Sequence, residues 1–176
     1  MHNTLSDVIL DTVQNSIEAG ARNMALSVSE DGGMFSVVLR DDGRGMDAAT
    51  LERAFDPFFS EAGKHDRRKV GLGLPFLRQL CEATGGNVEL ESEKGAGTLL
   101  KYVLPLRHVD LPPFGDLPGT LLVLFGHPGD FELVFTRRKG AEEYSVSRKE
   151  LSEALGGFED PSSLLLARKF LISLEG

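Results

Sequence analysis

Apolar residues recur along the first part of the chain at two different spacings. In the first segment they are three or four residues apart, at Leu5, Val8, Ile9, Val13 and Ile17. This spacing predicts an amphipathic helix over about residues 4–19, ended by Gly20. Apolar and polar residues then alternate around 24–28 and 35–39, which predicts two half-buried strands joined by a turn at 31–33. The chain therefore opens with a helix and a β-hairpin.

The next part of the chain adds two helices and two strands. A short helix is predicted over 47–55, where the aspartate at its start can cap it, whereas residues 56–70 show no periodicity and are expected to form a mobile loop. A longer helix follows and ends at Gly85-Gly86, and strands are expected around 87–92 and 98–104. This order predicts an α/β sandwich, with one layer of helices on a mixed, mostly antiparallel sheet.

The last part of the chain is less regular. Four prolines, at 105, 112, 113 and 118, predict a stiff linker over 107–119 between a first domain, 1–106, and an extension, 120–176. The elements expected in the extension are strands near 120–125, 131–136 and 143–146 and helices near 147–155 and 161–174. These α+β elements are too few to predict an independent domain, and the alternative is that they pack on the first.

Composition narrows the possible partners. With 27 acidic and 19 basic residues the chain has a formal charge of −8, which argues against sequence-independent nucleic-acid binding. Its longest apolar run, Leu121–Phe125, is far shorter than the roughly 20 residues that cross a bilayer. The start lacks the features of a secretory signal, and there is a single cysteine, Cys81. We therefore expect a cytoplasmic protein without membrane or nucleic-acid partners.

Two groups of residues are candidates for chemistry. Asp11 and Asn15 lie four residues apart and so share one face of the first predicted helix, where a carboxylate and an amide oxygen can hold Mg²⁺ and orient a water. Two solvated surface residues are the plainer explanation. Asp41, with Gly43 and Gly45, ends a strand, where a carboxylate can accept a hydrogen bond from an exocyclic amine and glycines allow close approach. A simple turn is the alternative.

Two further glycine motifs are weak when taken alone. Gly71-Leu72-Gly73-Leu74 opens a helix, and helix N-termini favour phosphates, but Phe76 stands where a dinucleotide fingerprint has its third glycine. Gly95-x-Gly97-Thr98 precedes a strand, and a hairpin turn explains it equally well.

In combination, these pieces resemble the histidine-kinase-like (GHKL) ATPase superfamily, whose members share the Bergerat ATP-binding fold. The resemblance covers about residues 4–105. Its motifs are the N box at 11–21, the G1 box at 41–46, the F box at 54–59, the G2 box at 71–80 and the ending at 85–98. Five motifs in register make the resemblance specific.

The resemblance implies ATP and Mg²⁺ as ligands. Asn15 would coordinate the metal, Asp41 would bond the adenine amine, and residues 56–70 would form the ATP lid. The residues that it assigns to ATP binding are Asn15, Asp41, Gly43, Gly45, Met46, Phe58, Lys64, Lys69, Gly71, Leu72, Gly73, Leu74 and Thr98. Lys64 and Lys69 belong to a basic run that would reach the γ-phosphate, although a solvated charge cluster is an equal alternative.

Two features bear on the reaction. Asp11 stands where gyrase and mismatch-repair ATPases carry a glutamate general base, so the resemblance makes it the candidate general base, although aspartate is one methylene shorter. Sensor kinases carry a phosphoacceptor histidine on helices before this domain, whereas here the N box starts close to Met1. We therefore expect a histidine-kinase-type module, or a weak ATPase, that phosphorylates a partner protein. A nucleotide-gated regulator without transfer and an anti-sigma-factor-type serine kinase are the alternatives, and homodimer formation is left open.

Overall fold

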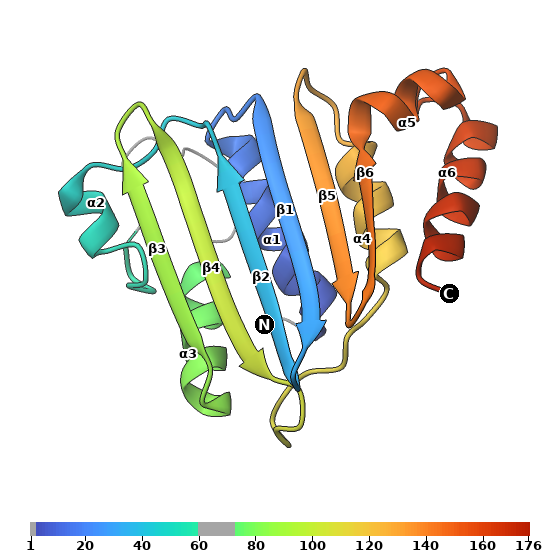
Figure 1. The fold of residues 1–176 in the computed structure, drawn as a ribbon. Coiled ribbons are helices and arrows are strands. Elements are labelled where there is room, and N and C mark those ends of the chain that lie inside the picture. Colours follow the sequence, from blue (N-terminus) through green and yellow to red (C-terminus); the bar gives the residue numbers. More distant parts are fainter. Residues whose placement is uncertain (1–2, 60–72) are drawn as a thin grey trace.

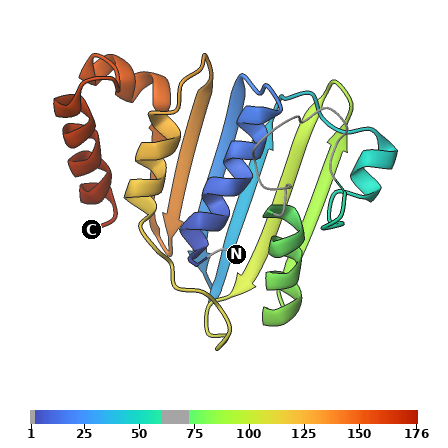
Figure 2. The same ribbon diagram turned by 180° about the vertical axis from the view of Figure 1, so that it is seen from behind.

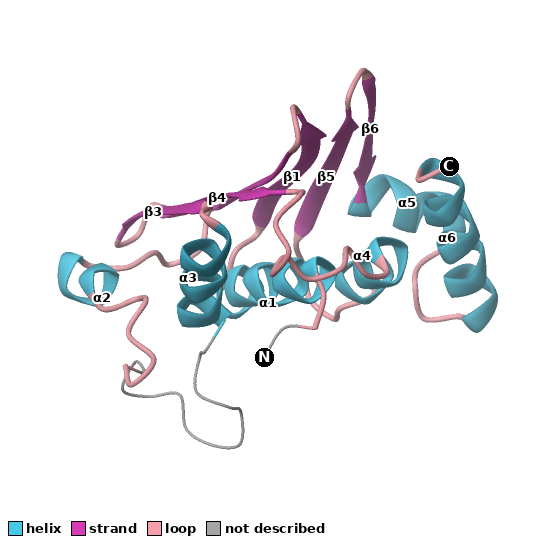
Figure 3. Ribbon diagram, turned by 90° about the horizontal axis from the view of Figure 1, so that it is seen from below, coloured by secondary structure: helices cyan, strands magenta, loops and turns pink. Residues whose placement is uncertain are grey.

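The chain folds into two layers, one sheet and one set of helices. The computed structural model describes residues 3–59 and 73–176. Six strands form the sheet in the order β3-β4-β2-β1-β5-β6, and the helices α1, α3 and α4 lie side by side against one face of it (Figures 1 and 2). The opposite face carries no helix, as the view along the layers shows for the described residues (Figure 3). The predicted α/β sandwich is confirmed.

The structure bears out most of the expected elements, with shifts of one to three residues at their ends. The helices are α1 (Leu5–Glu18), α2 (Ala48–Glu52), α3 (Gly73–Thr84), α4 (Leu117–Phe125), α5 (Arg148–Leu155) and α6 (Pro161–Leu174). The strands are β1 (Asn23–Asp31), β2 (Met34–Asp41), β3 (Asn87–Glu93), β4 (Gly97–Pro105), β5 (Glu132–Lys139) and β6 (Glu142–Ser147). None of the helices in these ranges is long and apolar enough to cross a membrane.

Helix α1 is defined at its start by a capping box. The side chain of Thr4 accepts a hydrogen bond from the Asp7 backbone (3.1 Å), and the Asp7 carboxylate accepts one from the Thr4 backbone (2.9 Å). These bonds satisfy two of the backbone donors that a helix start leaves unpaired. Of the predicted apolar stripe, Leu5, Val8, Ile9 and Val13 are buried and Ile17 is half-buried. The polar residues Ser6, Thr12 and Ser16 of the same helix are buried as well.

The end of β2 is the point at which the sheet meets the candidate site. β2 pairs antiparallel with β1 on one side and with β4 on the other. In this register Asp41 lies opposite Thr98. The motifs around Asp41 and around Gly95-x-Gly97-Thr98 are therefore brought together by strand pairing alone.

The extension continues the sheet of the first part. β5 pairs in parallel with β1 along eight residues, from Asn23↔Glu132 to Glu30↔Lys139, and β6 pairs antiparallel with β5. One parallel pair in an otherwise antiparallel sheet makes the sheet mixed. Of the two alternatives left by the sequence, packing on the first part is the one observed.

The strand predicted near 120–125 is wrong, because this segment is helix α4. A short apolar run cannot be assigned to helix or strand from periodicity, and the end signals decide here. Asp116 accepts a hydrogen bond from the Gly119 backbone at 2.9 Å, and Pro118 lies in the first turn, as helix starts favour. The helix thus begins inside the range predicted as a linker. Just before it, Pro113 and Phe114 accept backbone hydrogen bonds from the start of α1.

Candidate functional site

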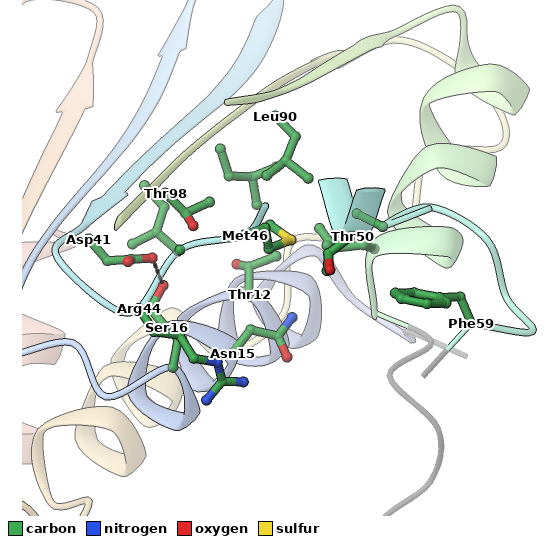
Figure 4. Close-up of a pocket in the computed structure, with 16 residues that line it drawn as sticks. Thr12, Asn15, Ser16, Asp41, Arg44, Met46, Thr50, Phe59, Leu90 and Thr98 are labelled. Atoms are coloured by element: carbon green, nitrogen blue, oxygen red, sulfur yellow. Dashed lines mark hydrogen bonds between the residues drawn. The ribbon is translucent and has the colours of Figure 1, made fainter. Parts of the chain in front are cut away.

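A cavity of about 180 Å³, open to solvent on one side, lies between α1, the ends of the central strands and the segment around α2 (Figure 4). Its lining residues are Thr12, Asn15, Ser16, Ala19, Leu39, Asp41, Arg44, Gly45, Met46, Thr50, Ala54, Phe59, Leu74, Leu90, Thr98 and Leu100. The walls are mostly apolar and the polar groups are few. This composition is typical of small-molecule sites.

Asp41 is the buried charged residue of this pocket, and only 8% of its surface is exposed. Its Oδ1 accepts a hydrogen bond from the Gly43 backbone at 2.9 Å, and its Oδ2 accepts one from the Ser16 hydroxyl at 2.6 Å. Both bonds fix the carboxylate between apolar walls. A carboxylate held in this way can accept a further hydrogen bond from an amine on a flat aromatic ring.

The next residue, Asp42, has a structural role. Its carboxylate accepts hydrogen bonds from the backbones of Arg22 (2.8 Å) and Asn23 (2.9 Å) and from the Asn23 side chain (2.8 Å). The bond from the Asn23 side chain is the largest of several that hold the pKa of Asp42 below its usual value. Of the two successive aspartates, one faces the pocket and the other ties the start of β1 to the end of β2.

The glycines at 45 and 97 are required because two backbones touch. Gly45 has φ +65° and Gly97 has φ +95°, a region that other residues rarely adopt. A Cβ atom on Gly45 would overlap the carbonyl oxygen of Glu93, and one on Gly97 would overlap that of Asp41. The motifs around Asp41 and Thr98 therefore form one packed unit at the end of the sheet.

A serine orders the hydroxyl of Thr98. Ser92 accepts a hydrogen bond from the Met46 backbone (2.9 Å), donates one to the Gly97 carbonyl (2.9 Å) and lies 2.8 Å from Thr98 Oγ1. Because a serine hydroxyl has a single proton, its bond to Gly97 makes Thr98 the donor of the third contact. Thr98 thus has an oxygen lone pair to offer at the pocket wall.

Asn15 lies at the other end of the pocket from the sheet, beside the start of α3. A Cβ atom on Gly73 would lie 3.8 Å from Asn15 Nδ2 and 3.8 Å from Asp11 Oδ2. The N-terminus of α3 therefore meets α1 at Asn15 and Asp11, although Asp11 itself is not part of the pocket lining. Amide, carboxylate and helix N-terminus together suit a metal-bound anion.

The structure brings together most of the predicted site. Asn15, Asp41, Gly45, Met46, Leu74 and Thr98 line the pocket. Gly43 lies against Ala19 and Gly73 lies beside Asn15, and both Ala19 and Asn15 line the pocket. The predictions for Lys64, Lys69, Gly71, Leu72 and most of the lid fall on residues 60–72, outside the described ranges.

One predicted lining residue is wrong by a single position. Phe58 is 93% exposed and does not line the cavity, whereas Phe59 does. The Asp56 side chain accepts a hydrogen bond from the Phe58 backbone (2.9 Å), and the Asp56 carbonyl accepts one from that of Phe59 (3.1 Å). This turn directs the second phenylalanine inward, and no periodicity in the sequence reveals its direction.

Two polar residues of α1 that line the pocket, Thr12 and Ser16, are not among the predicted site residues, although the sequence contains a signal for them. Thr12, Ser16 and Ala19 follow one another at helical spacing and line the pocket. Small residues at spacings of four and three interrupt an otherwise bulky apolar face, which indicates that something other than core side chains packs there. Arg44, Thr50 and Ala54 carried no such signal.

Known proteins match the same part of the chain. Residues 2–108 match the profile described as histidine kinase-, DNA gyrase B-, and HSP90-like ATPase. The histidine protein kinase DivJ of Caulobacter vibrioides is 32% identical over 105 residues, which are 58% of this chain and 18% of that protein. Sporulation kinase C of Bacillus subtilis is 30% identical over 107 residues, 60% of this chain and 24% of the kinase. The chain thus matches less than a quarter of the length of these curated relatives.

A solved structure resembles nearly the whole chain. The N-terminal domain of a DNA repair protein superposes with a TM-score of 0.60 at 16% identity, covering 93% of this chain and 59% of that one. At this identity the likeness concerns the fold alone. Its coverage exceeds residues 2–108 and so includes strands of the extension.

Proposed function

Because this chain belongs to the family of histidine kinase-, DNA gyrase B-, and HSP90-like ATPases, we propose that it binds ATP with Mg²⁺ and phosphorylates a partner protein. The observation that carries the proposal is that Asp41 and Asn15 line one pocket. A purine at Asp41 and a triphosphate at Asn15 require this arrangement. The kinase direction rests on the relatives, which are a histidine protein kinase and a sporulation kinase.

The base-binding end fits adenine. Asp41 is fixed by its two hydrogen bonds and accepts from the exocyclic amine, and Leu39, Leu90 and Leu100 supply apolar walls for the ring faces. Guanine presents a carbonyl oxygen at the position of this amine, and a carboxylate repels it. The pocket therefore favours ATP over GTP.

The end of the pocket at Asn15 fits a divalent ion that is also coordinated by the phosphates of the nucleotide. Asn15 offers an amide oxygen, and Mg²⁺ commonly takes one or two protein oxygens with the rest from phosphate and water. When bound, the ion neutralises charge on the phosphates. The backbone of Gly73 at the α3 start lies beside Asn15, so its amide and the helix dipole face the same phosphates.

Transfer needs little covalent chemistry from the chain. The acceptor nitrogen of a partner histidine forms a bond to the γ-phosphorus while the bond to the β,γ-bridging oxygen breaks. ADP leaves, and the proton on the other ring nitrogen of the histidine passes to solvent. Positioning and charge neutralisation supply most of the rate in such reactions, and the pocket residues named above provide both.

The proposal is tested in two steps. Calorimetry with ATP and Mg²⁺ measures binding, and γ-labelled ATP is then incubated with the chain and with proteins that it retains from its host's lysate. Acid-labile label on a retained protein is the expected result. Acid-stable label would indicate a serine kinase, and ATP binding without label on any partner would leave a nucleotide-gated regulator. Absence of ATP binding would overturn the proposal entirely.

A further inference from the structure

Arg44 stands between the two glycines of the loop that begins at Asp41, and its side chain lines the same pocket. It is the only cationic residue of the pocket lining within residues 3–59 and 73–176. The chain as a whole has a charge of −8. An anionic ligand would therefore meet Arg44 in a protein that is otherwise mostly acidic.

The backbone of Arg44 is held from two sides. Its amide donates a hydrogen bond to the Ala19 carbonyl at 2.9 Å, and its carbonyl accepts one from the Gly95 backbone at 2.7 Å. The first bond joins the loop to the end of α1, and the second joins it to the β3–β4 turn. These two bonds fix the position of the Arg44 backbone, from which the side chain extends.

The guanidinium lies along the last turn of α1. Its Nη1 donates a hydrogen bond to the Glu18 carbonyl at 3.2 Å. Glu18 is three residues after Asn15, so this bond places the guanidinium within one helix turn of Asn15, and both residues line the pocket (Figure 4). Asp41 is further in. The positive charge therefore lies at the end of the pocket where Asn15 is, and away from the base-binding carboxylate.

We propose that Arg44 binds the phosphate groups of the nucleotide and makes the pocket select nucleotides over nucleosides. This inference rests on the proposed function, because it places the phosphates at Asn15. A guanidinium has five N–H donors in a planar fork, which allows it to hold the Glu18 carbonyl and phosphate oxygens together. Bonds of this charged type are about twice as strong as neutral ones.

The experiment compares four ligands on the full chain with EDTA present, so that no metal contributes. ATP, ADP, AMP and adenosine are titrated by calorimetry into the parent and into R44A, R44Q and R44K. R40A is the matched control. Arg40 is four positions earlier on β2 and exposed, and its neighbours Leu39 and Asp41 line the pocket. Because side chains alternate along a strand, Arg40 lies on the opposite face of the sheet.

We expect R44A and R44Q to lose about tenfold or more in affinity for ATP and ADP, the effect of one charge-assisted hydrogen bond. Adenosine affinity should not change, R44K should recover part of the loss, and R40A should match the parent. R44Q keeps a donor for the Glu18 carbonyl, so a loss of ATP affinity in this variant comes from the missing positive charge and not from the missing contact with α1.

Two results would overturn the inference while the proposed function survives. The first is unchanged ATP affinity in R44A, and the second is an equal loss for adenosine and ATP, which would mean that Arg44 only shapes the loop. A parent chain that binds none of the four ligands would instead overturn the proposed function and this inference with it.

Discussion

The hydroxyl of Ser16 donates a hydrogen bond to Oδ2 of Asp41 across 2.6 Å, and both residues are buried. This bond joins α1 to the end of β2. Since Ser16 directly follows Asn15, the same helix turn that presents the amide at the pocket mouth also fixes the carboxylate deeper in. The distance between the two ends of the pocket is therefore set by one rigid helix.

Replacing Asp41 by asparagine should remove base recognition without unfolding the chain. The amide oxygen of D41N can still accept from the Gly43 backbone, and its NH₂ group can donate to Ser16. The NH₂ group of the new side chain then faces the exocyclic amine of adenine, and because both groups are donors no hydrogen bond forms between them. ATP affinity should therefore fall about tenfold or more. Calorimetry measures the affinity, and circular dichroism checks the fold. D42N is the control at a neighbouring aspartate that faces away from the pocket, and equal losses in both variants would contradict the assignment.

Replacing Asn15 by alanine should affect metal-dependent binding selectively. With Mg²⁺ present the affinity for ATP should fall about tenfold, whereas with EDTA it should change little, since the amide acts through the ion. Gln14, which precedes Asn15 on α1 and does not line the pocket, provides the control variant Q14A. A loss of the same size in both buffers would show that Asn15 contacts the nucleotide directly.

Alanine at Gly45 should destabilise the fold strongly. The positive φ costs about 1–2 kcal/mol in any other residue, and the overlap with the Glu93 carbonyl adds about 1–3 kcal/mol. Gly32 also has a positive φ, of +56°, but nothing lies within 4 Å of a Cβ atom there. G32A should therefore lose only the strain. Urea unfolding of both variants measures the difference, and equal losses would refute the backbone contact.

The sequence predicted the site better than its surroundings because the site depends on local motifs. Asp41 ends a strand with clear alternation, and Asn15 sits at a fixed position on a clearly amphipathic helix, so their placement follows from secondary structure and one strand pairing. The sequence does not distinguish Phe58 from Phe59, because an irregular turn has no periodicity. The direction of such a side chain is decided by the hydrogen bonds of Asp56, which only the folded structure contains.

The extension shows a different limit. Its strands β5 and β6 lie near their predicted positions, but the pairing of β5 with β1 is not predicted, because periodicity gives the faces of a strand and not its neighbours. The strand predicted near 120–125 is wrong for a related reason. Its apolar run fits a helix or a strand equally well. Asp116 and Pro118 decide for a helix, but both lie within the predicted linker, 107–119.

A buried arginine should hold α6 on the sheet. Arg137 of β5 is 2% exposed, forms ion pairs with Glu30 of β1 and Glu175 after α6, and lies 5.2 Å from the Phe114 ring centroid. Removing one member of a buried ion network costs about 3–5 kcal/mol, so R137M should lower the free energy of unfolding by an amount of that order. R138M changes the exposed neighbour and should change little. Equal stability of both variants in urea would contradict the role of Arg137.

The buried thiol of Cys81 should make stability fall in mild alkali. Burial, with a smaller contribution from Glu82, raises the pKa of Cys81 to about 11, whereas an unfolded chain releases this proton near pH 8.5, the usual value for cysteine. Between these values the unfolded state binds fewer protons than the folded state, so the free energy of unfolding decreases as the pH rises. Urea unfolding at about pH 8 and pH 10 should show a smaller decrease in C81A than in the parent, because alanine does not titrate. The tyrosines and lysines are common to both chains and contribute to both decreases, and identical decreases would mean that the thiol titrates normally in the folded protein.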